Sequence, residues 1–95
     1  MPTVATGDVE TYYERRGAGP PVVFVHGALA DHTAATGQLE AFGDDFTAIA
    51  YDLRGHGRTA NPGETPYSVD RLAEDLHAFV EALDLDRPVV CGVSL

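Results

Sequence analysis

The chain of 95 residues contains no lysine, a single cysteine and no long apolar run. Because one cysteine cannot pair within the chain, Cys91 excludes a small scaffold held together by internal disulfides. No apolar stretch approaches the roughly 18 residues of a membrane-spanning helix, and no secretory signal peptide is recognisable. We therefore expect a cytoplasmic protein without a membrane partner.

Positive charge is also scarce. Six arginines face 15 acidic residues, which gives a formal net charge of -9 and a pI near 4.5. Such a surface repels the phosphates of nucleic acids and of anionic lipids, so neither is an expected partner. The lack of lysine together with the acid excess fits two explanations, adaptation to high salt and an ordinary acidic product of a GC-rich gene.

The length allows one small domain and no more. Leu, Ile, Val and Phe supply 23 of the 95 residues, above the roughly 20% below which a highly charged chain tends to stay disordered. The four histidines lack the spacing of a metal site, and no pair of cysteines assists them. We expect a folded domain that uses neither a metal nor a cofactor.

Turn residues and apolar runs predict an alternation of strands and helices. The residues from Thr3 to Arg16 predict two short antiparallel strands around a tight turn at Gly7-Asp8. Three apolar runs predict strands of a parallel sheet, buried on both faces: 22–25, 46–51 and 89–91. Two intervening helices complete a strand pair followed by β-α-β-α-β, which is an α/β fold with helices covering the sheet.

Apolar spacing predicts which faces of the helices are buried. Asp31 or Thr33 would cap the first helix, which presents Ala35, Leu39 and Phe42 to the sheet. Ser68 would cap the second, whose apolar stripe comprises Val69, Leu72, Ala73, Leu76, Val80 and Leu83. The opposite, solvated face comprises Asp70, Glu74, Asp75, Glu81 and Asp84. We expect His32 and His77 at the surface and Cys91 as a buried, unreactive thiol.

Chemically distinctive residues follow the three strands of the expected parallel sheet. His26-Gly27 follows the first strand, residues 52–59 (Asp-Leu-Arg-Gly-His-Gly-Arg-Thr) follow the second, and residues 92–95 (Gly-Val-Ser-Leu) follow the third. Functional groups of parallel sheets gather at the carboxyl ends of the strands, so these segments are expected at one edge. The last segment supplies four positions of G-x-S-x-G, in which a serine sits at a sharp strand-to-helix turn.

In this order the three segments resemble the α/β-hydrolase superfamily of the serine-nucleophile type. The resemblance covers essentially the whole chain and implies the N-terminal half of that fold, ending at the nucleophile elbow, with residues 1–95 forming an incomplete domain. It implies that Ser94 is the nucleophile and that the backbone N–H groups of Leu95 and Ala28 form the oxyanion hole, with Leu29 as the alternative to Ala28. Structural roles in the motifs fall to His26, Gly27, Asp52, Arg54, Gly55, Gly57 and Gly92.

The chain differs from the family pattern at its C-terminal end. In the family the triad acid and then the histidine follow the serine, whereas this chain has one residue after Ser94. We therefore expect residues 1–95 to be inactive by themselves. Serine at this position disfavours relatives resembling haloalkane dehalogenases and soluble epoxide hydrolases, which have aspartate there. Esters and related carbonyl compounds remain as small-molecule substrates.

Two other interpretations are open. Residues 55–60 formally fit G-x-G-x-x-A of dinucleotide-binding proteins, although Asn61-Pro62-Gly63 continues the loop where that fingerprint should begin a helix. Alternatively, the chain is a non-catalytic remnant or a module completed by a partner. An open sheet edge would then favour self-association.

Overall fold

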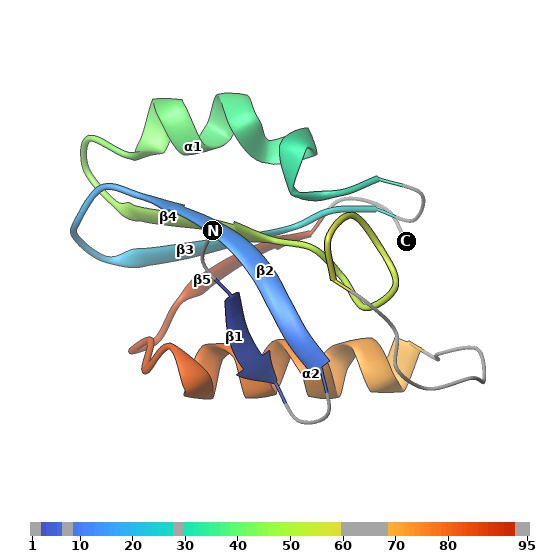
Figure 1. Cartoon of the computed structure of the whole chain (residues 1–95). Coiled ribbons are helices and arrows are strands. Elements are labelled where there is room, and N and C mark those ends of the chain that lie inside the picture. Colours follow the sequence, from blue (N-terminus) through green and yellow to red (C-terminus); the bar gives the residue numbers. More distant parts are fainter. Residues whose placement is uncertain (1–2, 7–8, 28–29, 60–68, 93–95) are drawn as a thin grey trace.

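The computed structural model describes residues 3–6, 9–27, 30–59 and 69–92. The described residues form a five-stranded sheet with helices on both faces (Figure 1). The elements in chain order are β1 (Thr3–Thr6), β2 (Val9–Arg16), β3 (Pro21–Val25), η1 (His32–Ala35), α1 (Thr36–Phe42), β4 (Thr47–Tyr51), α2 (Val69–Ala82) and β5 (Val89–Gly92).

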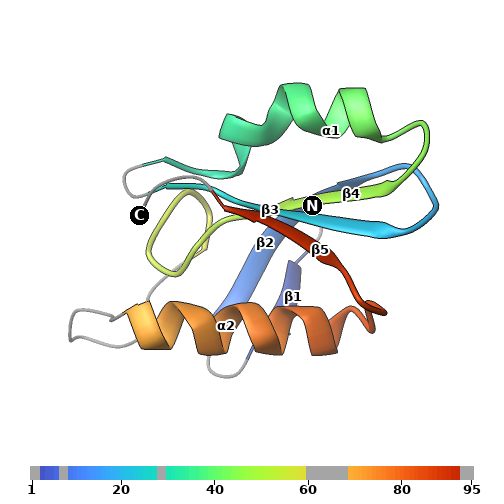
Figure 2. The ribbon, with the colours of Figure 1, turned by 180° about the vertical axis from the view of Figure 1, so that it is seen from behind.

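The sheet has the order β1-β2-β4-β3-β5. β1 pairs with β2 and β2 with β4 in antiparallel fashion, whereas β3 runs parallel to both β4 and β5. The predicted strand pair and parallel strands are therefore confirmed. η1 and α1 lie over one face of the sheet and α2 lies over the other, as Figures 1 and 2 show from opposite sides.

Each face of the sheet has its own apolar cluster, and β4 contributes to both because it is buried along its whole length. The cluster under α2 comprises Val23, Ile49, Tyr51, Leu53, Leu72 and Phe79. The cluster under α1 comprises Ala35, Leu39, Ala48 and Ala50. Tyr51 stacks on Phe79 with ring centroids 4.5 Å apart, which anchors α2 to the centre of the sheet.

The predicted faces of α2 need correction. Ala73 is exposed, whereas Phe79 is fully buried and Asp75 is only 6% exposed. Leu72, Asp75 and Phe79 lie on the inward face because they are spaced by three and four residues. Asp75 belongs to this face because a buried arginine binds its carboxylate. His77 is exposed, as expected, and Ser68 lies outside the described residues.

The first helix begins as expected but in a different form. Asp31 caps η1 by accepting a hydrogen bond from the backbone N–H of Thr33, and the chain passes from this 3-10 turn into α1. Ala35 and Leu39 are buried, but Phe42 is 41% exposed because it lies at the end of α1. Its ring packs against Phe24 and Phe46 beside the sheet.

The strand β5 is exposed, contrary to the predicted burial. Val89 is 59% and Val90 is 45% exposed, and the thiol of Cys91 is also exposed. The reason is that β5 is an edge strand, which pairs with β3 alone among the described strands. Within the described residues no helix is long and apolar enough to cross a membrane.

Candidate functional site

The pairing of the parallel strands brings the motif segments to one edge of the sheet. Val25, the last residue of β3, lies opposite Tyr51 of β4 and opposite Gly92 of β5. His26-Gly27 and the loop that begins at Asp52 therefore leave the sheet side by side, as predicted. Ala28, Ser94 and Leu95, the residues assigned to the oxyanion hole and the nucleophile, lie outside the described residues.

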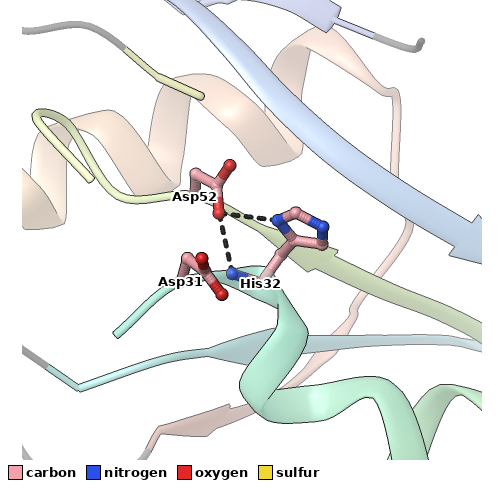
Figure 3. A group of neighbouring side chains, drawn as sticks. All are labelled: Asp31, His32 and Asp52. Atoms are coloured by element: carbon pink, nitrogen blue, oxygen red, sulfur yellow. Dashed lines mark hydrogen bonds and ion pairs between the residues drawn. The ribbon is translucent and has the colours of Figure 1, made fainter. Parts of the chain in front are cut away.

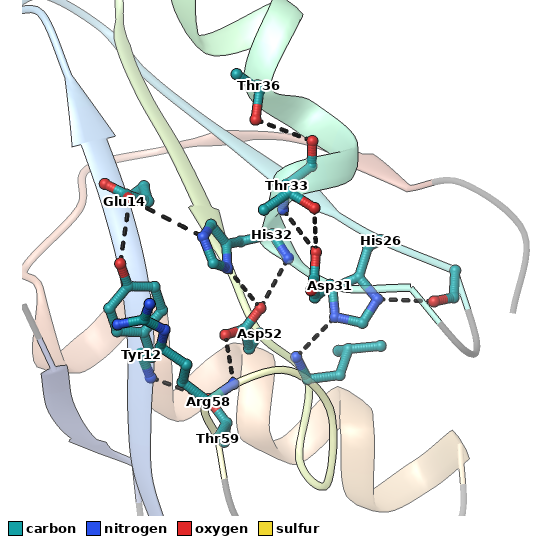
Figure 4. Close-up of polar contacts among 12 residues, drawn as sticks. Tyr12, Glu14, His26, Asp31, His32, Thr33, Thr36, Asp52, Arg58 and Thr59 are labelled. Carbon is teal, nitrogen blue, oxygen red and sulfur yellow. Dashed lines mark hydrogen bonds and ion pairs between the residues drawn. The ribbon is translucent and has the colours of Figure 1, made fainter.

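Asp52 is the centre of a hydrogen-bond network at this edge (Figure 4). Its carboxylate is fully buried, and three N–H groups of the described residues donate to it. Oδ1 accepts from the backbone N–H of His32 at 2.7 Å and from His32 Nδ1 at 2.8 Å, and Oδ2 accepts from the backbone N–H of Arg58 at 2.9 Å. Such donors compensate the cost of burying the charge.

Gly57 makes room for this carboxylate. The backbone at Gly57 has φ +52, and a Cβ there would lie 2.5–2.6 Å from the carboxylate carbon and both oxygens of Asp52. No side chain fits at that distance. The glycine predicted as a motif residue is therefore required by the packing of the loop against Asp52.

His26 orders the turn after β3. Its Nε2 accepts a hydrogen bond from the backbone N–H of Leu53 at 2.9 Å, and its Nδ1 lies 2.7 Å from the carbonyl oxygen of Gly27. These contacts imply the tautomer with the proton on Nδ1, since Nε2 must offer a lone pair. The expected structural role of His26 fits this geometry.

Arg54 connects the same loop to α2. Its Nε and Nη2 donate to the two carboxylate oxygens of Asp75 at 2.9 and 3.0 Å, and both side chains are buried. The expected role of Arg54 is to hold the loop through local hydrogen bonds or a charge pair. A charge pair fits this geometry, and its partner lies 21 residues away on the inward face of α2.

His32 was expected at the surface, and the structure corrects this. Its side chain is 13% exposed, its ring binds Asp52, and it packs against the ring of Tyr12 with centroids 4.8 Å apart. No motif marks this residue, because its contact with Asp52 depends on how η1 is placed over β4. The one available signal was its position within six residues of the His26-Gly27 turn.

Asp31, His32 and Asp52 also place three possible metal ligands within 4.8 Å of one another (Figure 3). All three residues already take part in hydrogen bonds. Asp31 Oδ1 accepts from the N–H and hydroxyl of Thr33, which lowers the pKa of Asp31, and Asp52 Oδ1 accepts twice from His32. The cluster is better described as a hydrogen-bond network than as a cation site. That the protein uses no metal remains a prediction.

Comparison with known proteins identifies the family. A model of the alpha/beta hydrolase fold matches residues 20–95. The chain belongs to the α/β hydrolase family. It is 41% identical over 87 residues to a non-heme chloroperoxidase of Kitasatospora aureofaciens, a match that covers 90% of this chain and 31% of that protein.

Solved α/β hydrolase structures have the same fold. The enol-lactonase from Burkholderia xenovorans superposes with a TM-score of 0.91 at 28% identity, covering 98% of this chain and 37% of that one. An epoxide hydrolase from Bacillus megaterium gives 0.89 at 27% identity, covering 96% of this chain and 32% of that one. The chain thus spans about a third of the length of these α/β hydrolases.

A hollow of about 460 Å³ lies beside the network. It is lined by Ala30, Asp31, Thr33, Ala34 and Gly57. These residues belong to the turn after β3, to η1 and to the loop after β4, so the hollow opens at the edge of the sheet that carries the α/β hydrolase motifs.

Proposed function

We propose that the protein carrying this chain is a serine hydrolase that cleaves ester-type or related carbonyl substrates through an acyl-enzyme on Ser94. One observation supports the proposal most directly. β5 runs parallel to β3 with Gly92 opposite Val25, so the last described residue before the serine motif lies beside the point where His26-Gly27 leaves the sheet. The segment Gly92-Val93-Ser94-Leu95 matches the first four positions of the nucleophile elbow of the family.

The proposed reaction has two halves. The hydroxyl oxygen of Ser94 attacks the substrate carbonyl carbon while a base removes its proton, and the negative carbonyl oxygen is held by the N–H groups of Leu95 and of Ala28 or Leu29. Collapse of this intermediate breaks the ester bond, and the leaving alkoxide takes the proton from the base. A water molecule activated by the same base then hydrolyses the acyl-enzyme and regenerates Ser94.

Two of the histidines described in the structure, His26 and His32, are poor substitutes for that base. His26 uses the lone pair of Nε2 to accept from the backbone N–H of Leu53, so that nitrogen is not free to take a proton. The ring of His32 packs against Tyr12 of β2. In the sheet, β4 and β3 separate β2 from β5, the strand that precedes Ser94 in the chain. By resemblance, the base is a histidine that follows Ser94 in the chain and is oriented by an acid. We therefore propose that residues 1–95 alone are inactive.

The names of the relatives cover several reactions, among them those of an enol-lactonase, a non-heme chloroperoxidase and an epoxide hydrolase. Serine at position 94 favours carbonyl substrates over epoxides, because the resembled epoxide hydrolases have aspartate there. A small-molecule substrate, no cofactor and no nucleic acid partner complete the proposal. The alternative is a non-catalytic remnant or a module completed by another chain.

The test is hydrolysis of p-nitrophenyl acetate by the full-length gene product, with Ser94→Ala as the decisive variant. Loss of the nucleophile should lower kcat by at least about 1,000-fold. Ser68→Ala is the matched control, because Ser68 is the other serine in the chain and is expected to cap α2. Hydrolysis that survives Ser94→Ala, or a folded full-length protein with no hydrolysis at all, would contradict the proposal and favour the alternative.

A further inference from the structure

We propose that His32 is a positioning residue, which together with Asp52 fixes the backbone segment that supplies the oxyanion hole. The inference rests on the proposed hydrolase function, since it explains how the N–H of residue 28 or 29 would be held in place. His32 touches neither substrate nor nucleophile in this proposal. Its role is to attach the C-terminal end of residues 27–32 to the loop after β4.

The first observation is the way in which His32 binds Asp52. Both its backbone N–H and its ring Nδ1 lie within 2.8 Å of the same carboxylate oxygen. Because a carboxylate oxygen has no hydrogen to donate, the ring contact is a hydrogen bond donated by Nδ1–H. One residue thus contributes two of the three described donors of a fully buried carboxylate. Hydrogen bonds to a charged acceptor are stronger than neutral ones, so His32 is held firmly to Asp52.

The second observation is that the other end of the segment is attached to the same loop. His26 accepts from the backbone N–H of Leu53, and its Nδ1 contacts the carbonyl oxygen of Gly27. The backbone N–H of Ala30 donates to Gly27 at 3.2 Å. The described residues on both sides of positions 28 and 29 are therefore attached to the same loop, His26 to Leu53 and His32 to Asp52, and these two partners are adjacent in the chain.

The third observation is that the ring of His32 is itself fixed from β2. The Tyr12 ring packs against it, and Nε2 lies 3.9 Å from a carboxylate oxygen of Glu14. Tyr12 in turn donates its backbone N–H to the hydroxyl of Thr59 at 2.9 Å and its own hydroxyl to Glu14 at 3.1 Å (Figure 4). The ring of His32 is held between Asp52 and β2. Contacts on both sides therefore restrict its rotation and keep Nδ1 directed at Asp52.

Such a device matters for catalysis because oxyanion donors act only when they are already in place. A backbone N–H that shifts by a fraction of an ångström binds the planar carbonyl almost as well but stabilises the tetrahedral oxyanion less. Loss of the His32 side chain should therefore lower kcat while leaving KM nearly unchanged. A general loss of stability would instead affect the fraction of folded enzyme and every region of the fold.

The experiment uses the full-length protein with His32→Ala and His32→Asn, and His77→Ala as the control. We expect His32→Ala to lower kcat for p-nitrophenyl acetate by about 10- to 100-fold, with KM changed by less than about threefold. The side-chain amide of asparagine can donate to Asp52, so His32→Asn should recover most of this loss. His77 lies exposed on α2, and its removal should leave kcat unchanged.

Amide hydrogen exchange gives a readout that does not require activity. In the unaltered protein the N–H of His32 should be protected, and His32→Ala should accelerate exchange within residues 27–32 while α2 stays protected. The proposal is overturned if the His32 N–H exchanges freely, if His32→Ala keeps full kcat, or if His32→Asn is no better than His32→Ala. Failure of the hydrolase function itself is recognised separately, because Ser94→Ala would then retain activity while the exchange result still reports on the attachment.

Discussion

Single residues around Asp52 determine the shape of the candidate site. A buried carboxylate needs donors and space, and the chain supplies both, from η1 and from the loop after β4. His32 and Arg58 donate N–H groups to the carboxylate of Asp52. Gly57 has no Cβ, so it leaves free the space that this carboxylate occupies. The glycine after His56 is therefore needed for packing as well as for its positive φ.

Replacing Gly57 with alanine tests this packing. The new methyl group would overlap the carboxylate of Asp52 in a backbone conformation that L-residues rarely adopt. We expect Gly57→Ala to lower the free energy of unfolding by about 2 kcal/mol or more, measured by urea denaturation. Gly37→Ala is the matched control, because Gly37 lies in α1 with nothing within 4 Å of the position of a Cβ. That variant should be as stable as the original chain or up to about 1 kcal/mol more stable, and equal stability of the two variants would contradict the role of Gly57.

The elements could be predicted because their signals are local. Apolar runs and turn residues predicted β3, β4 and α2, and the Gly7-Asp8 break predicted the pair formed by β1 and β2. Partners that depend on how elements pack could not be predicted in this way. Asp75 resembles any acidic residue of an amphipathic helix until Arg54 is placed beside it, and His32 resembles a surface histidine until η1 is placed over Asp52.

The start of η1 carries a pH dependence of its own. Asp31 accepts from the hydroxyl and backbone N–H of Thr33, and these hydrogen bonds lower the pKa of its carboxyl below the ordinary value of 3.8. A lowered pKa in the folded state means that the charged cap contributes stability above pH 3.8. That contribution is lost as the pH falls through the pKa of the folded state.

Asp31→Asn isolates the charge, because asparagine is also a good cap. Above about pH 5 we expect the variant to be less stable by under about 1 kcal/mol, since the carboxyl is partly solvated. The difference should shrink toward zero as the pH is lowered below 4 and should also fall with added salt. Thermal unfolding of both proteins across this range measures it. A stability difference that is unchanged or larger at low pH would refute the assignment of the charge to this cap.

On the scale of the whole molecule, β5 is the feature that sets this chain apart from a closed domain. Parallel sheets are normally covered on both faces, yet Val89, Val90 and Cys91 of β5 are exposed here. The prediction that Cys91 is buried failed because the apolar character of a strand does not reveal whether a neighbour covers it. We propose that a polypeptide of residues 1–95 associates with a second copy through this edge.

Sedimentation velocity of that polypeptide tests the self-association. We expect it to sediment as dimers or larger species, and we expect Val90→Lys to shift the distribution toward monomer by placing a charge on the edge strand. His77→Lys adds the same residue type at an exposed position on α2 and should leave the association unchanged. A folded polypeptide that sediments as a monomer at all concentrations would rule out association through β5.

The nucleophile assigned to Ser94 is best tested by covalent labelling of the full-length gene product with a fluorophosphonate, followed by mass analysis of its peptides. An activated serine displaces fluoride from phosphorus, so the reagent reports directly on a serine with a working base and oxyanion hole. We predict one phosphonyl group per chain, located on Ser94, and none in Ser94→Ala. A folded protein in which Ser94 stays unlabelled, or in which another residue carries the adduct, would contradict the assignment of a serine hydrolase with its nucleophile at this position.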